Sequence, residues 1–118
     1  MPEHSEQVHQ LAEHYRVVLG LYRELEELSQ RIFDAFQDPS RAGGLTETLK
    51  AKLAVVTRIQ EESRLINGLK AALDLSESER DTVRRAENQL TDLVKRVVEH
   101  EDRSRNLFAR RGVRISRI

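Results

Sequence analysis

Residues 8–36 read VHQLAEHYRVVLGLYRELEELSQRIFDAF, and the spacing of their apolar side chains decides the fold. The apolar positions recur at steps of three or four residues: Val8, Leu11, Tyr15, Val18, Tyr22, Leu25, Leu28, Ile32 and Phe36. Such spacing keeps one face of an α-helix turned toward a core. We therefore predict a helix over about residues 4–37, ending before Pro39 because proline disfavours helical geometry in the preceding residue. We interpret Gly20 as a close approach between helices, with a hinge as the alternative.

Two further segments carry the same periodicity. The second apolar row runs through Leu45, Leu49, Leu53, Val56, Ile59, Ile66 and Leu69, and it predicts a helix over about residues 45–73. Gly68 lies inside this helix and is about 1 kcal/mol less favourable there than alanine, so we expect a weak point or an early end near it.

The third segment begins with a capping signal. In Ser76-Glu77-Ser78-Glu79, Ser76 and Glu79 can each satisfy the other's backbone N–H. The apolar row that follows consists of Val83, Ala86, Leu90, Leu93, Val94 and Val97. We predict a helix over about residues 76–111, which ends at Gly112, a residue typical of helix C-termini.

Composition agrees with a helical protein. Charged residues make up 34% of the chain, apolar residues 38% and aromatic residues 4%, a balance that favours long helices over a sheet sandwich. Short connections place successive helices as antiparallel neighbours. We predict an all-α fold, a long antiparallel three-helix hairpin or bundle over residues 1–112, followed by a basic tail over 113–118. A core built from such narrow rows is often completed by dimerisation or by a partner's helix.

The sequence lacks the residues that several kinds of catalytic or metal site require. The chain has no cysteine, which excludes disulfides, thiolate zinc sites and cysteine nucleophiles. It also lacks a phosphate-binding glycine loop and a nucleophile elbow. Glu6 and His9 have the spacing of half a di-iron site, but no second pair matches, because Val97 precedes His100 by three residues. We expect no enzyme activity, no cofactor and no metal, and we expect His4, His9 and His14 to be solvated on helix surfaces.

The expected location of the protein follows from the lack of a signal-peptide pattern and of a long apolar run in the sequence. The N-terminal residues have no basic region leading into an apolar core, as a signal peptide would. No apolar run approaches the ~20 residues that span a bilayer. We therefore expect a cytoplasmic protein without a membrane span.

Charge is balanced overall but uneven along the chain. The 20 basic and 20 acidic residues cancel, yet residues 103–118 hold six arginines and no acid. Four of these form the basic tail with its helix end: Arg110, Arg111, Arg114 and Arg117. The tail has three interpretations: a solvated end, a segment that folds over an apolar groove, or a contact to nucleic acid or acidic membrane. The acidic body and the lack of interleaved aromatic residues beyond Phe108 disfavour nucleic acid.

The end of the third helix is a candidate docking point. No apolar residue occurs between Val98 and Leu107, and Leu107 and Phe108 then resume the row. If the helix projects past the second one, this Leu-Phe pair is uncovered and can receive a partner helix. The alternative is that both pack on the first helix or in a dimer.

The chain also resembles a known family. Over residues 8–111 the sequence combines a long first helix, a break containing proline and glycine, a second helix with LAVVTRIQEESR (53–64) and a third with LVKRVVEHEDRSRNL (93–107). This combination resembles the flagellar type III export chaperones of the FlgN and FliT kinds. The resemblance implies a small cytoplasmic chaperone that keeps a hook-associated or filament-cap protein soluble and delivers it to the export apparatus. It implies that an apolar surface of the last helix captures a helical tail of the client, at Leu90, Leu93, Val94, Val97, Leu107 and Phe108. The arginine-rich end after Gly112 departs from this family.

Three functional hypotheses follow. The first is a non-catalytic, protein-binding chaperone or adaptor, with a flagellar export client. The second is a structural coiled-coil or helical-bundle homodimer that acts as a scaffold. The third is a small nucleic-acid-binding regulator that uses the arginine tail.

Overall fold

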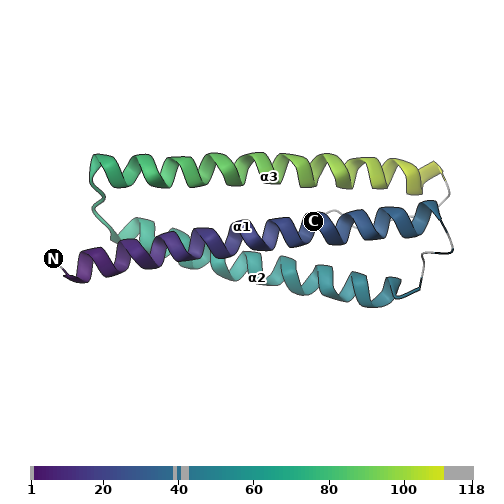
Figure 1. Cartoon of the computed structure of the whole chain (residues 1–118), viewed down its shortest axis with the longest axis horizontal. Coiled ribbons are helices and arrows are strands. Elements are labelled where there is room, and N and C mark those ends of the chain that lie inside the picture. The colour runs from purple at the N-terminus through teal and green to yellow at the C-terminus, as the bar shows by residue number, and fades with distance from the viewer. Residues whose placement is uncertain (1, 39, 41–42, 111–118) are drawn as a thin grey trace.

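The computed structural model describes residues 2–38, 40 and 43–110, and these form three α-helices (Figure 1). Helix α1 spans Pro2–Gln37, α2 spans Leu45–Ala72 and α3 spans Glu77–Arg110. The rods lie side by side in a body with extents of 57 × 22 × 18 Å. The all-α three-helix prediction is confirmed, and the expected helix ranges agree with these bounds to within about two residues. The segment 113–118 lies outside the described residues.

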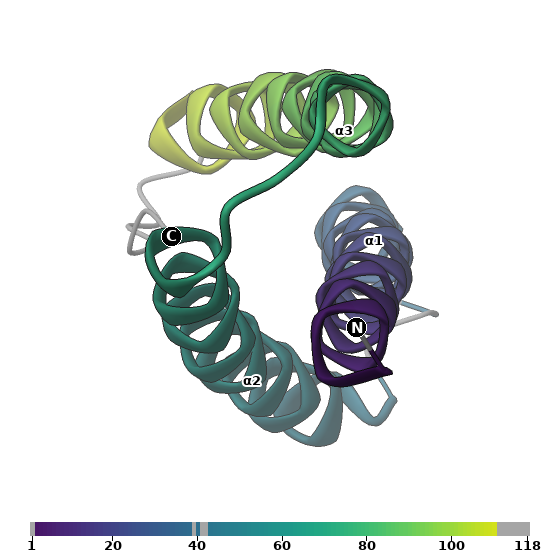
Figure 2. The same ribbon diagram turned by 90° about the vertical axis from the view of Figure 1, so that its left-hand side faces the viewer.

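Helix α1 is the centre of the bundle. It packs along both α2 and α3, whereas no Cα atoms of α2 and α3 come within 8 Å of each other in the described part of the chain. Figure 2, a view along the bundle, shows the three helices in an arc that is open between α2 and α3. Successive helices were expected to be neighbours. This holds for α1 and α2, but α3 packs on α1, to which it runs parallel (Figure 1).

The buried face of α1 explains its central place. Two rows of buried residues repeat every seven positions, Leu11, Val18, Leu25 and Ile32 in one and Leu21, Leu28 and Ala35 in the other. Two adjacent rows with this repeat let one helix contact a helix on each side, as in coiled coils. Most of the predicted α1 row is therefore core.

The core forms two clusters along the rod. One surrounds Leu25 and takes Val55 and Ile59 from α2 and Val97 from α3. The other surrounds Val18 and is completed by side chains of the same three helices, including Leu11, Tyr15, Ile66, Val83 and Leu90. All three helices thus contribute to both clusters.

The phase of α2 differs from the prediction at its N-terminal end. Leu49 and Leu53 were expected to face the core, but they are 45% and 69% exposed. Val55 is buried instead, while Ile59 and Ile66 of the predicted row are buried as expected. The reason is Lys52, whose side chain is mostly buried because its ammonium group pairs with Glu101 of α3. Lys52 therefore takes the inward-facing position of α2 that was predicted for Leu49 and Leu53.

The close contact expected at Gly20 and the early helix end expected near Gly68 are both absent from the described helices. Gly20 is exposed, and a Cβ added there would meet no other atom within 4 Å, so it marks no close contact between helices. Gly68 is also exposed with open space around it, and α2 continues past it to Ala72. Neither glycine is required by packing.

These open positions give a stability prediction. Gly20→Ala and Gly68→Ala should each raise the free energy of unfolding by about 0.5–1 kcal/mol, because alanine restricts the unfolded chain and fits helical geometry. Urea denaturation followed by circular dichroism measures the change. A loss of stability in either variant would show that a second surface uses that position.

Candidate functional site

The apolar row predicted to bind a client faces inward along much of its length. Leu93 and Val97 are only 4% and 3% exposed, and Leu90 packs against the cluster around Val18. Val94 is half-buried. The expectation of an open strip is therefore not met at Leu93 and Val97, because this face of α3 packs on α1.

The remaining predicted site residues have no described side chains. Leu107, Phe108 and Arg110 belong to the last turns of α3, but their side chains lie outside the described part. Arg111, Arg114 and Arg117 lie beyond the described residues altogether. Their proposed roles stay predictions.

A buried polar contact joins all three helices near the start of α2. Lys52 Nζ lies 2.7 Å from Glu101 Oε1, and the Ser29 hydroxyl donates a hydrogen bond of 2.7 Å to the same oxygen. Glu101 and Ser29 are each 3% exposed. The carboxylate therefore replaces water with one ammonium group and one hydroxyl, as a buried charge requires.

A second contact of the same design lies nearer the N-terminus of α3. The Tyr15 hydroxyl donates a hydrogen bond of 3.0 Å to Glu87 Oε1, and Lys70 Nζ lies 2.5 Å from that oxygen. The hydrogen bond from Lys70 lowers the pKa of Glu87 below its usual range. Burial, together with the nearby Glu87, raises the pKa of Tyr15 well above its usual value. At neutral pH the tyrosine thus remains a donor and the glutamate an acceptor.

Exposed and half-buried apolar side chains gather around the first of these contacts. Leu49 and Val56 lie three residues before and four residues after Lys52, so they share its side of α2. Leu53 continues this row, since it follows Leu49 by four residues and precedes Val56 by three. Val98, which is 41% exposed, precedes Glu101 by three residues and shares its side of α3.

We call this surface the α2–α3 seam, and define it as Leu49, Leu53 and Val56 of α2 with Val94 and Val98 of α3. The two rows flank the Lys52–Glu101 contact at the edge where the two helix backbones do not approach each other. Leu65 is also exposed, but it lies alone on another side of α2, and single exposed apolar residues are normal on protein surfaces. The seam is the apolar surface left open by the packing of α3 on α1.

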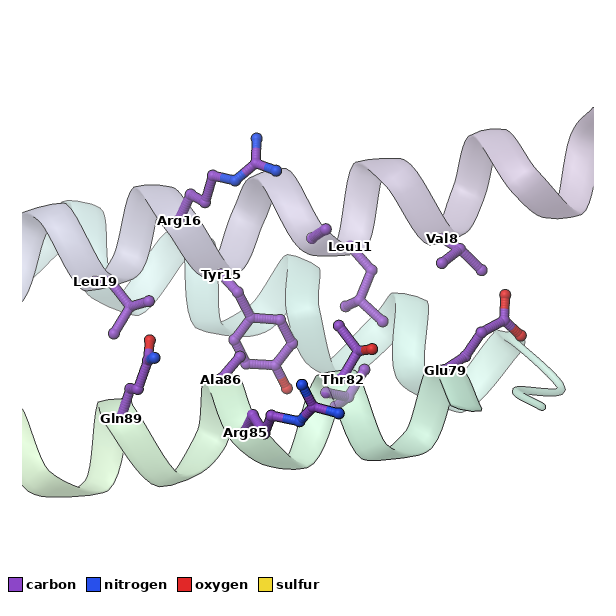
Figure 3. A pocket seen from close by; sticks show the side chains of 12 residues that line it. Val8, Leu11, Tyr15, Arg16, Leu19, Glu79, Thr82, Arg85, Ala86 and Gln89 are labelled. Carbon is purple, nitrogen blue, oxygen red and sulfur yellow. The ribbon is translucent and has the colours of Figure 1, made fainter. Parts of the chain in front are cut away.

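A concave surface lies between α1 and α3. This α1–α3 groove has a volume of about 320 Å³. Its walls include Val8, Ala12, Tyr15, Leu19, Val83 and Ala86, and Arg16 and Arg85 come from opposite walls (Figure 3). The size and the mainly apolar walls are typical of ligand-binding clefts.

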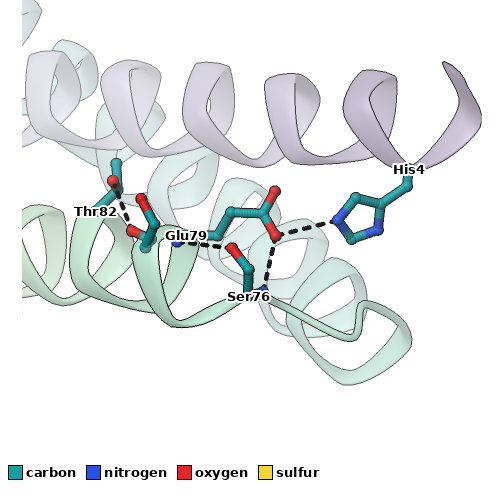
Figure 4. A network of polar contacts seen from close by, with 5 residues as sticks. His4, Ser76, Glu79 and Thr82 are labelled. Carbon is teal, nitrogen blue, oxygen red and sulfur yellow. Dashed lines mark hydrogen bonds and ion pairs between the residues drawn. The ribbon is translucent and has the colours of Figure 1, made fainter. Parts of the chain in front are cut away.

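Glu79 closes one end of this groove through the capping contacts of α3. The Ser76 backbone N–H donates to Glu79 Oε1 at 2.8 Å, and the Glu79 N–H donates to the Ser76 hydroxyl at 3.2 Å, which confirms the predicted capping box. His4 Nε2 of α1 lies 3.1 Å from the same carboxylate oxygen (Figure 4). These hydrogen bonds, first the one from Ser76, lower the pKa of Glu79. The carboxylate is therefore already engaged.

Sequence reasoning missed the roles of two histidines. His4 pairs with Glu79, and His14 Nδ1 lies 2.5 Å from Glu62 Oε2 of α2. Both were expected to be solvated, yet both join α1 to another helix. Their spacing along α1 gave no signal, because each pairing depends on a residue distant in sequence.

The described residues include no group of three or more histidine, aspartate or glutamate side chains placed to hold a metal ion. No helix within the described ranges is long and apolar enough to cross a membrane. Comparison with protein-family models, with curated proteins and with solved structures finds no match to this chain.

Proposed function

We propose that this chain is a non-catalytic, protein-binding adaptor that holds an amphipathic helix of a partner in the α2–α3 seam. The observation that carries the proposal is the clustering of Leu49, Leu53 and Val98, each more than 40% exposed, at this open edge. A helix laid along the seam would cover these side chains and contact both α2 and α3, a common mode of helix recognition in a groove.

The proposed client is a helical segment of a secreted flagellar protein, such as a hook-associated or filament-cap protein. The resemblance to flagellar export chaperones supports this client class. The site differs from the one that the resemblance implied. The seam uses Val94 and the neighbouring Val98 of α3 together with α2 residues, whereas Leu93 and Val97 are in the core.

Leu53→Asp tests the seam. Burial of one leucine contributes about 1.5–3 kcal/mol, and each 1.4 kcal/mol is tenfold in affinity, so the variant should bind the client more weakly. The expected loss is thus about tenfold at the lower bound and about 100-fold at the upper bound of that range. Isothermal titration calorimetry with helical peptides from the C-terminal ends of hook-associated and filament-cap proteins measures this. Melting temperature and helicity should stay unchanged, because Leu53 is largely exposed.

Leu65→Asp is the matched control. Leu65 is 50% exposed on the same helix, but it is turned by about 120° from Leu53 at 100° per residue. This variant should keep wild-type affinity. If both variants bind equally well, the seam is not the docking surface; if none of the peptides binds the wild type, the client is not of this class.

The alternative function, a homodimeric scaffold, would use the same open edge as the interface between two copies of the chain. A second copy that places its own seam on the first would also cover Leu49, Leu53 and Val98. Sedimentation equilibrium separates the two functions, because a scaffold predicts a dimer at micromolar concentration that Leu53→Asp dissociates. A wild-type monomer at that concentration favours the adaptor.

A further inference from the structure

We propose a second docking site, independent of the seam: the α1–α3 groove takes up a short amphipathic helix that carries acidic side chains beside its apolar row. The groove lies on the other flank of α3, so α3 would take part in both sites.

The length of the groove fits about three helical turns. Its α1 wall runs from Val8 to Leu19, which is about 16 Å at 1.5 Å per residue. The α3 wall covers a similar length, from Glu79 to Gln89. Because α1 and α3 are parallel, a third helix laid between them meets both walls along its whole length, as in a coiled coil.

The wall residues permit a close approach. Ala12 of α1 and Ala86 of α3 are small and only half-buried, and the distance between helix axes depends on the side chains at the contact. Beneath them, Leu11 and Tyr15 are buried, and the Tyr15 hydroxyl is already bonded to Glu87. The floor thus presents apolar surface without a polar group that needs a partner.

The charge at the rim selects an acidic occupant. Arg85 makes no ion pair or hydrogen bond with another described residue, and Arg16 pairs only with Glu13 of its own helix. Glu79, the acidic residue of the lining, is engaged by Ser76 and His4. Arg85 therefore offers one exposed guanidinium group at the α3 wall, where a carboxylate of a bound helix would complement it. The guanidinium group of Arg16 points away from α3 (Figure 3) and is engaged by Glu13.

Two synthetic peptides test the proposal. Both are 14 residues long with one row of leucine and alanine, flanked by glutamates in one peptide and by lysines in the other. Each is titrated into the ¹⁵N-labelled full chain and followed by NMR. The acidic peptide should bind about tenfold more tightly than the basic one at low salt, since complementary charges replace repulsive ones, and it should shift the amide signals of Ala12 and Ala86.

A second experiment reverses the charge of Arg85 and repeats the titration with both peptides. Arg85→Glu should abolish or reverse the preference for the acidic peptide. Arg84→Glu is the control, because it makes the same change in net charge at the preceding residue. Arg84 pairs with Asp81 at 3.5 Å and does not line the groove, so this variant should keep the preference for the acidic peptide. Equal binding of the two peptides to the wild type, or shifts confined to Leu49, Leu53 and Val98, would overturn the proposal without affecting the seam.

Discussion

Lys52→Met is expected to lower the free energy of unfolding by about 3–5 kcal/mol, because it leaves a buried carboxylate without its counter-charge. Glu101 is 3% exposed, and only the Ser29 hydroxyl would remain bonded to it. Urea denaturation at pH 7 measures the loss. Lys50→Met is the control: Lys50 pairs with Glu47 at 3.8 Å on the exposed surface, and such pairs contribute about 0–1 kcal/mol.

The double variant Lys52→Met/Glu101→Met should recover most of this stability. Replacement of a whole buried ion pair by apolar side chains of similar volume is often neutral or stabilising. If Lys52→Met alone costs less than about 1 kcal/mol, water reaches the pair and the contact is a surface one. If the double variant is as unstable as the single one, the Lys52–Glu101 contact is required to hold α2 and α3 in position around α1, and not only for charge balance.

The second large effect is expected at Leu25. Leu25→Ala should lower the free energy of unfolding by about 2–5 kcal/mol, because the side chain is 1% exposed at the centre of the core cluster that takes residues from all three helices. Leu53→Ala removes the same atoms from an exposed position and should change stability by no more than about 0.5 kcal/mol. Thermal and urea unfolding of the two variants measure both values. A large loss at Leu53 would instead support the α2 phase expected from the sequence.

The success of the fold prediction rests on α1. Its apolar residues are numerous enough that spacing alone identifies both the helix and its buried face, from Leu11 to Ile32. Helix ends were also predictable, because Ser76 and Glu79 satisfy each other's backbone groups locally. Local chemistry is present in the sequence and can be inferred from it.

The phase of α2 was not predictable in this way. An apolar row through Leu49 and Leu53 satisfies helical periodicity as well as a row through Lys52 and Val55, and both rows lead to Ile59. The choice between them depends on Glu101, which is 49 residues away in sequence and which supplies the charge that makes burial of Lys52 possible. A hydrophobic pattern contains no information about that pairing.

The candidate site was missed for a related reason. Which edge of a three-helix bundle stays open depends on whether α3 packs on α1 or on α2, and short connections allow both. The polar run 99–106 was assigned no core role, yet Glu101 and Ser104 are buried. Polar residues on the inner face of α3 identify this packing only once their partners on α1 and α2 are known.

The two polar contacts also determine the longitudinal alignment of α1 and α3. Tyr15 and Glu87 are 72 residues apart, and so are Ser29 and Glu101. Deletion of a single residue from α3 between Glu87 and Glu101 would turn one glutamate by about 100° relative to the other, so that only one contact could form. Removal of seven residues between the contacts from each of α1, α2 and α3 would restore both contacts, including those of Lys52 and Lys70, in a body about 10 Å shorter. A change in length between the two contacts therefore preserves both of them only if whole heptads are removed or added in all three helices together.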